Sequence, residues 1–192
     1  MTPFIKVTAF ALVGCALGYF SAQHVISGRV GDLTVDNEGW KLWKFAGQKD
    51  ADPYTKAHFA LRHELPLTGF EEMTFSTEVD SAGGTLNSNC IYTLKSNDLP
   101  SRAWALSAVS LDGSRPNPSQ ERQSFNTANV IRKGDGSFEI ALSTSARPGN
   151  WLPLSAEEGQ FKIALSLLNP YRKIIEDPMQ AKLPKIALET CR

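Results

Sequence analysis

Three histidines are the first candidates for acid-base chemistry in this sequence: His24, His58 and His63. Nucleophilic catalysis needs such a base within hydrogen-bond reach of a serine or cysteine. His24 lies in an apolar N-terminal run, and His63 is expected on a polar surface. His58 falls on the apolar side of an expected helix, where a histidine is more often a hydrogen-bonded core residue than a base. We therefore keep His58 as a candidate ligand-binding residue and assign no catalytic residue.

Other motifs that could carry chemistry have simpler interpretations. The sequence contains no Gly-x-Ser-x-Gly nucleophile motif. Gly-Asp-Gly-Ser at 134–137 lacks the lysine and helix of a phosphate-binding loop, so it predicts a hairpin turn. The carboxylate pairs at 71–72 and 157–158 are adjacent in sequence, and neighbours on a strand point to opposite faces. No Cys/His spacing resembles a zinc site, so neither a metal nor a cofactor is predicted.

The segment Arg-Pro-Gly-Asn-Trp-Leu-Pro-Leu-Ser at 147–155 holds a tryptophan in a stiff, bent stretch of backbone. We expect Trp151 to close one end of a core, since large aromatic side chains mostly serve cores and interfaces. The alternative is a stacking platform for a sugar or a lipid headgroup. The further residues expected around such a ligand site are Asn150, Trp104, Tyr92 and Tyr54.

The charge of the chain argues against one class of partner. Twenty basic and twenty acidic residues cancel in a chain of 192 residues, without a strong block of either sign. Binding to a nucleic-acid backbone needs clustered Lys and Arg. We therefore expect no nucleic-acid partner.

The N-terminal segment differs from the rest of the sequence. Residues 7–26 contain no Asp, Glu, Lys or Arg, and as a helix they would reach about 30 Å, the thickness of a hydrocarbon core. An uncleaved single-span anchor is the favoured interpretation. A lipoprotein signal with Cys15 as the lipidated residue and a simple cleaved signal remain alternatives. All three place the rest of the chain outside the cytoplasm, and the anchor predicts a bacterial inner-membrane protein with its domain in the periplasm.

The two remaining cysteines agree with export. Cys90 and Cys191 lie about a hundred residues apart, and in an oxidising compartment they would close a large loop. We expect a disulfide, with two buried free thiols as the alternative.

One amphipathic helix is expected after the anchor. Asp52 is a good N-cap and Pro53 suits the first helical position, while Pro66 and Gly69 stop the helix after about three turns. Helical spacing predicts that one face packs against a larger body. The residues of that face are Tyr54, Ala57, His58, Leu61 and Leu65.

The larger body is predicted to be β-structure. Strands are expected near 40–45, 73–80, 90–96, 102–111 (possible burial on both faces), 159–170 and 185–190, and another through Ile140 and Leu142, with an extended loop after residue 111. Turn residues recur every ten to fifteen positions, which favours a mainly β antiparallel sandwich, jelly-roll-like, over βαβ alternation. We expect residues 1–27 as the anchor or signal, 28–39 as a linker, and 40–192 as the β domain.

Several of these segments together resemble the DUF1214 family of bacterial envelope proteins in its short, membrane-anchored form. The resemblance rests on Asp52-Pro53-Tyr54, on Asn-Trp-Leu-Pro at 150–153 and on the segments 99–113, 135–155 and 161–170. It implies a mostly β domain in the periplasm behind one span, and it carries no catalytic residues. Ser166 and Leu168 stand where the family often has Arg and Tyr.

The sequence therefore predicts a non-enzymatic binding or interaction module of the cell envelope. Its expected partners are the inner membrane and an envelope glycan, a lipid or another membrane protein. One alternative is a carbohydrate-active enzyme or hydrolase with a site near Trp151. Another is an accessory subunit of a membrane complex, for which Gly14-x-x-x-Gly18 offers a small-residue helix contact.

Overall fold

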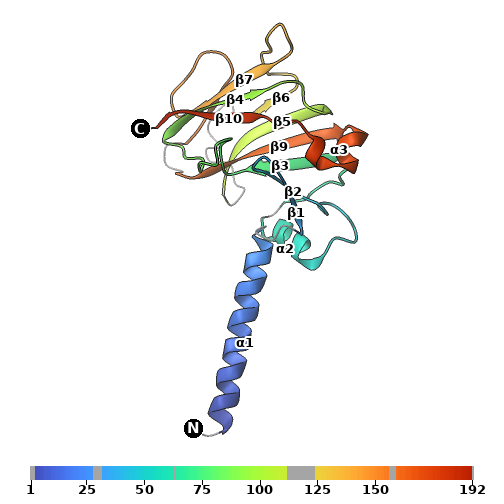
Figure 1. Ribbon diagram of the computed structural model, residues 1–192, viewed down its shortest axis with the longest axis vertical. Helices are drawn as coiled ribbons and strands as arrows, with labels where there is room; N and C mark the ends of the chain where they lie inside the picture. The colour runs from blue at the N-terminus through green and yellow to red at the C-terminus, as the bar shows by residue number, and fades with distance from the viewer. Residues whose placement is uncertain (1–2, 28–31, 63, 112–123, 156–158, 192) are drawn as a thin grey trace.

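Two β-sheets, a long N-terminal helix and three short helical segments make up the computed structural model, which describes residues 3–27, 32–62, 64–111, 124–155 and 159–191. Helix α1 (Pro3–Ile26) projects from the foot of the β domain, and α2 (Pro53–Leu61) lies at that foot (Figure 1). The mainly β architecture expected from the sequence is confirmed.

The larger sheet has six strands, and every neighbouring pair in it is antiparallel. The long central strands supply most of its pairing. In spatial order the strands are β1 (Thr34–Asn37), β2 (Trp40–Trp43), β3 (Glu72–Thr77), β9 (Phe161–Pro170), β5 (Ser101–Ser110) and β6 (Ser124–Asn126).

The smaller sheet has four strands, and it departs from the expected all-antiparallel pattern. Strand β8 pairs with β7 in parallel, with Ala141 opposite Trp151. Alternation of apolar residues predicts strands but carries no information about their direction, so the sequence did not reveal this pair. In spatial order the strands are β10 (Lys185–Cys191), β4 (Cys90–Ser96), β7 (Phe138–Ser143) and β8 (Trp151–Pro153).

The core lies between the two sheets. Trp104 of β5 stacks on Phe138 of β7 with ring centroids 4.8 Å apart. Tyr92 of β4 meets Phe161 of β9 edge to face at 6.2 Å. Each pair joins the two sheets, so the inner faces pack against each other as in a sandwich.

Most predicted strands are confirmed, and the differences are local. Strand β3 buries Met73, Phe75 and Thr77 on one side as expected. Strand β5 is not fully buried on both faces, because the side chains opposite its core-facing residues are mostly half-buried. The segment 28–39, expected as a linker, contains β1. The extended loop expected after Leu111 covers residues 112–123, which lie outside the described residues.

The C-terminal tail, whose first part was ambiguous in sequence, forms two short helical turns before its last strand. They are α3 (Arg172–Glu176) and a 3₁₀ turn, η1 (Pro178–Gln180). The expected final strand follows as β10.

Helix α1 has the length and composition of a membrane span. It contains 24 residues, none of them buried against the rest of the protein. Within the described residues it is the one helix long and apolar enough to cross a bilayer. Gly14 and Gly18 have nothing within 4 Å of an added Cβ, so this side of the helix is open.

Helix α2 begins as predicted but buries a different face. The Asp52 carboxylate accepts hydrogen bonds from the backbone N–H groups of Tyr54 and Thr55, at 2.9 and 3.0 Å. The buried residues are Thr55 and His58, three positions apart. Three residues of the predicted packing face, Tyr54, Leu61 and Leu65, are instead exposed. The prediction was right for His58 but wrong for these three residues, because the sheet is met by the Thr55–His58 side of the helix.

The predicted disulfide is confirmed. Cys90 and Cys191 are bonded across 101 residues of sequence and lie opposite each other in the β4–β10 pair. The bond therefore ties the last strand to the interior of the smaller sheet. Cys15 is a free, exposed cysteine in α1.

Candidate functional site

A cavity of about 570 Å³ lies between α2 and the outer face of the six-stranded sheet. Its floor is formed by outward-facing residues of β2, β3, β9 and β5, and its wall by α2 and the loop 64–67. A volume of this size is typical of small-molecule sites. Ser27, which follows α1, also lines it, so the cavity lies at the end of α1.

Charged side chains of both signs line this cavity. The pairing of the strands brings these side chains to one face of the sheet. In this register, Ser76 of β3 lies opposite Ala164 of β9, and Val109 of β5 lies opposite Lys162 of β9. Lys162 is buried although it carries a charge. The lining has three basic and three acidic residues, which are Lys41, Arg62, Lys162, Glu64, Glu72 and Glu78. The charges balance, which favours a neutral or zwitterionic ligand over a simple anion or cation.

Apolar side chains form a second part of the lining, beside uncharged polar ones such as Thr74 and Ser76. Trp43 and Val109 come from the sheet, while Leu65 and Leu67 come from the loop after α2. The lining is therefore more polar than the mainly apolar walls that are usual for ligand sites. The arrangement suits a molecule with both polar and apolar parts.

His58 joins the cavity to α1. Its Nδ1 lies 2.7 Å from the carbonyl oxygen of Ile26, the last residue of α1. Its ring packs on Trp43 with the centroids 4.1 Å apart. The last carbonyls of a helix lack partners within the helix, so the Nδ1–H group supplies a donor for one of them.

Burial lowers the pKa of His58 from 6.5 to about 4. The positive charges of Arg62 and Lys162 act in the same direction, and the hydrogen bond to Ile26 opposes them in part. The imidazole is therefore neutral at pH 7. It lines the cavity, yet only 7% of the residue is exposed.

Trp151 does not belong to the core, so the expectation that it closes a core end was wrong. The next residue, Leu152, is buried instead, because neighbours on a strand point to opposite faces. Trp151 is half-buried on β8, and its Nε1–H donates to the carbonyl and hydroxyl oxygens of Ser143, both at 3.1 Å. It lines neither this cavity nor the second one described below.

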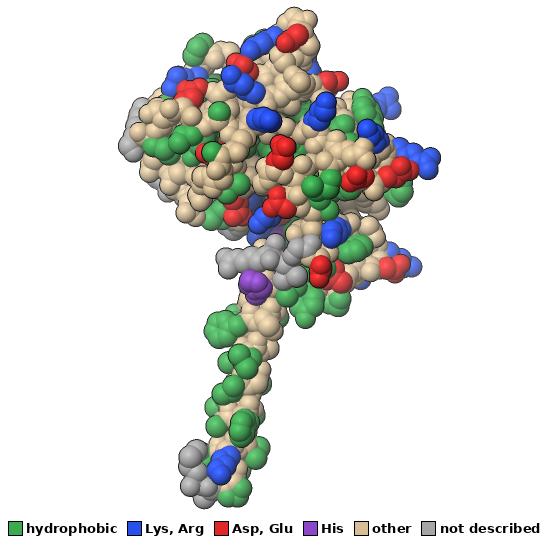
Figure 2. All heavy atoms as spheres, in the orientation of Figure 1, with side chains coloured by type: hydrophobic (Ala, Val, Ile, Leu, Met, Phe, Trp, Pro, Cys, Tyr) green, Lys and Arg blue, Asp and Glu red, His purple; other side chains and the backbone are tan. Residues whose placement is uncertain are grey.

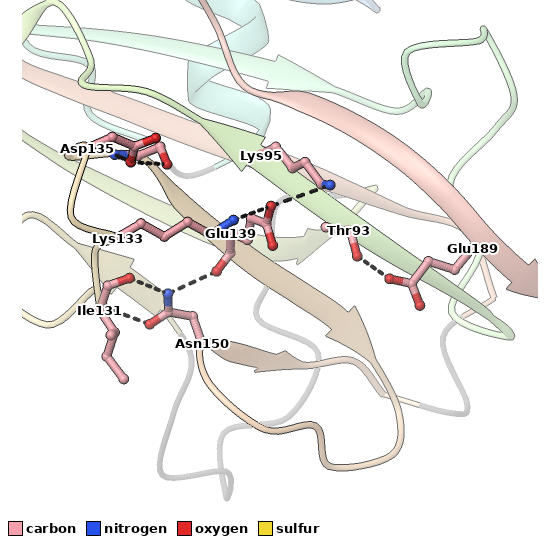
Figure 3. Close-up of polar contacts among 9 residues, drawn as sticks. Thr93, Lys95, Ile131, Lys133, Asp135, Glu139, Asn150 and Glu189 are labelled. Atoms are coloured by element: carbon pink, nitrogen blue, oxygen red, sulfur yellow. Dashed lines mark hydrogen bonds and ion pairs between the residues drawn. The ribbon is translucent and has the colours of Figure 1, made fainter.

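Asn150 is a buried structural link between two loops (Figure 3). Its side-chain amide donates to the carbonyl oxygens of Ile131 at 2.8 Å and Glu139 at 2.9 Å. Its carbonyl oxygen accepts from the backbone N–H of Ile131 at 2.8 Å. These bonds occupy the polar atoms of the side chain, so a ligand would have to displace them.

Trp104 and Tyr92 are core residues rather than parts of an open site. Both are 2% exposed. The Tyr92 hydroxyl accepts from the backbone N–H of Asn87 at 2.9 Å, and burial raises the pKa of this phenol. Trp104 Nε1 has no partner among the described residues. Tyr54 lies on α2, at the opposite end of the domain from β7 (Figure 1).

The predicted ligand residues thus do not form one site. Of the six, only His58 lines the cavity. Sequence reasoning missed Lys162, whose signal was a single lysine within the apolar run Phe-Lys-Ile-Ala-Leu at 161–165. It also missed Lys41 and Glu78, for which the sequence offered no signal.

A second, more open cavity of about 650 Å³ lies beside β4, β7 and the segment 179–185. Glu139, one of the charged residues that line it, forms ion pairs with Lys133 at 2.7 Å and Lys95 at 3.4 Å (Figure 3). The hydrogen bond from Lys133 lowers the pKa of this carboxyl group. Because Glu139 is already paired with two lysines, we consider the first cavity the better candidate.

Comparison with known proteins identifies the family. The model of a family described as "Protein of unknown function (DUF1214)" matches residues 71–172, more than half of the chain. The chain belongs to this family. The match includes β3, β9 and β5, whose outer faces form the floor of the cavity. A comparison with curated proteins returned no match.

Two solved structures match this chain, and the first of them is similar to it in fold. A protein of Vibrio parahaemolyticus shares 17% identity at a TM-score of 0.59, over 71% of this chain and 35% of that one. An uncharacterised protein of Burkholderia cenocepacia shares 14% identity at a TM-score of 0.47, over 100% of this chain and 44% of that one. This chain therefore spans less than half the length of either protein.

Among the described residues, no group of three His, Cys, Asp or Glu side chains is arranged to hold a metal ion. The candidate site is the α2–sheet cavity with its balanced charges and His58.

Proposed function

We propose that this protein is a single-span binding module of the cell envelope, with its β domain in the periplasm. The observation that carries the proposal is the α2–sheet cavity, which opens beside the end of α1 and holds balanced charges next to apolar side chains. A zwitterionic lipid headgroup matches this lining, because its phosphate would pair with Lys or Arg and its amine with Glu.

Export is supported by two independent features. The apolar helix α1 is long enough to span a bilayer. The Cys90–Cys191 disulfide is of a kind that persists in oxidising compartments and is rare in the cytosol. Together they favour the inner membrane as the site of anchoring and the periplasm as the location of the domain.

A hydrolase is the second candidate function, and one observation favours it. His58 is a neutral imidazole that lines a cavity, as a general base would. However, its Nδ1 is bonded to Ile26 and its ring packs on Trp43. These contacts fit a residue that holds elements together, so we place binding first.

The test is ligand binding by the full chain in detergent micelles. Calorimetry would use two probes: dihexanoylphosphatidylethanolamine, and the disaccharide of N-acetylglucosamine and N-acetylmuramic acid. We expect the lipid to bind and Lys41→Met to weaken binding about tenfold, as loss of one charge-assisted contact would. Lys41 is exposed and lines the cavity, so this variant should fold.

The matched control is Lys173→Met on α3, an exposed lysine outside the cavity, which should bind like the wild type. Binding of the disaccharide alone, with the same dependence on Lys41, would overturn the lipid assignment. Binding of neither probe, or equal effects of the two variants, would contradict the cavity as the site.

A further inference from the structure

An exposed apolar patch lies on α2 and the loop that follows it. We call it the apolar foot, and it consists of five residues within residues 54–70. Their exposed fractions are 44% for Tyr54, 64% for Leu61, 95% for Leu65, 48% for Leu67 and 75% for Phe70. Exposed apolar side chains gathered in one region mark interaction surfaces more often than chance.

The domain itself does not explain these exposed residues. A surface helix normally turns its apolar residues to the core and its polar residues to water. Helix α2 follows this pattern only in part: it buries Thr55 and His58 and half-buries Phe59. Tyr54 and Leu61, seven positions apart, are exposed and share the outer side. Leu65 and Phe70 extend the same apolar character into the loop.

The apolar foot lies where the anchor helix meets the domain. The hydrogen bond from His58 to the Ile26 carbonyl fixes α2 against the end of α1. Hydrophobic side chains are visible on the underside of the domain, beside the upper end of α1 (Figure 2). If α1 spans a bilayer, this underside faces the bilayer surface.

The residue types also suit that environment. Tyrosine is enriched at the interface between headgroups and acyl chains. Phenylalanine and leucine are common on the buried face of helices that lie in this interface. Exposed Lys56, on the same helix, could reach lipid phosphates, as basic residues of interfacial helices do.

We propose that the apolar foot inserts into the interfacial layer of the bilayer that α1 spans. It would be a second membrane contact, which fixes the orientation of the β domain and keeps the α2–sheet cavity at the lipid surface. This inference rests on the proposed anchoring by α1, and the experiment separates the two.

The experiment places a fluorescent probe on the full chain in lipid vesicles. Single cysteines replace Leu65, Leu12 or Ile131 in a Cys15→Ala background and are labelled with an environment-sensitive dye; Cys90 and Cys191 stay disulfide-bonded. Leu12 lies in α1, and exposed Ile131 precedes β7 at the far end of the domain (Figure 1). Nitroxide groups at a shallow or a deep position of the lipid then report contact.

We expect the dye at Leu65→Cys to shift to shorter wavelength and to be quenched most by the shallow nitroxide. The dye at Leu12→Cys should be quenched most by the deep one, and that at Ile131→Cys by neither. If the Leu12 dye is quenched but the Leu65 dye behaves like that at Ile131, the apolar foot does not touch the membrane and the inference fails. If the Leu12 dye also escapes quenching, the anchoring itself is wrong.

Discussion

At the scale of single residues, His58 performs two tasks with one ring. Its Nδ1 satisfies a terminal carbonyl of α1, and its face packs on Trp43 of the sheet. In this position the imidazole is neutral at pH 7, because burial and two nearby cations lower its pKa to about 4. Stability therefore depends on pH through this residue.

The pH dependence has a definite sign. The unfolded chain takes up a proton on His58 as pH falls through 6.5, whereas the folded chain resists until about 4. Stability is therefore full above pH 6.5 and declines as pH falls towards 4, by about 2 kcal/mol between pH 7 and 5. Replacing the ring with a side chain that keeps a donor but does not titrate, as in His58→Asn, should remove this slope.

Melting temperatures of wild type and His58→Asn at pH 7 and pH 5 test this prediction. The variant starts from a lower value because it loses the stacking on Trp43, so the slope rather than the absolute temperature is compared. An unchanged slope would show that His58 is not held neutral in the folded protein.

At the scale of elements, α2 decides where the cavity lies. The helix is only nine residues long, and isolated helices of that length are marginal in water. Its start is defined by the Asp52 cap. Partial burial acts to raise the pKa of this carboxyl group, but hydrogen bonds from Thr55 and Tyr54 outweigh it and lower the pKa, so the cap is charged at neutral pH.

Asp52→Ala should destabilise the protein by about 1 kcal/mol, because two backbone N–H groups lose their acceptor. Chemical denaturation measures this loss. The control is Asp50→Ala, an exposed aspartate two residues earlier, for which little change is expected. Equal losses in both variants would mean that negative charge, and not the cap, is what matters.

At the scale of the whole molecule, one covalent bond joins the last strand of the β domain to an inner strand of the smaller sheet. Strand β10 is an edge strand that pairs only with β4, and the Cys90–Cys191 disulfide supports that pairing. On the chain-entropy model, a bond that closes a loop of this length raises the free energy of the unfolded chain by about 4.7 kcal/mol, because it removes conformational entropy from that chain.

Cys90→Ser combined with Cys191→Ser should therefore lower the free energy of unfolding by about 4 kcal/mol in urea titrations. Cys15→Ser, which removes the free cysteine, should leave it unchanged. An unaltered midpoint in the double variant would contradict the stabilising role.

The number of free thiols in the protein tests whether the β domain resides in an oxidising compartment. Protein extracted from membranes and alkylated without reductant should gain one label, at Cys15, in an intact-mass measurement. Three labels would contradict residence in an oxidising compartment.

Local patterns in the sequence predicted much of this protein. The apolar run 7–26 predicted α1, alternation predicted most strands, and Asp52-Pro53 predicted the start of α2. These features depend on neighbours in the chain, because hydrophobic periodicity and capping act over a few residues. The disulfide could also be predicted, since only two cysteines remained outside the apolar segment.

Only the tertiary structure decided the site. Lys41 of β2, Glu78 directly after β3 and Lys162 of β9 share a cavity because these strands pair in one register and α2 covers that face. The burial of Thr55 and His58 in place of Tyr54 and Leu61 was decided in the same way, by which side of α2 met the sheet. Contacts between distant segments depend on sheet order and register, and a single sequence does not encode these in any local pattern.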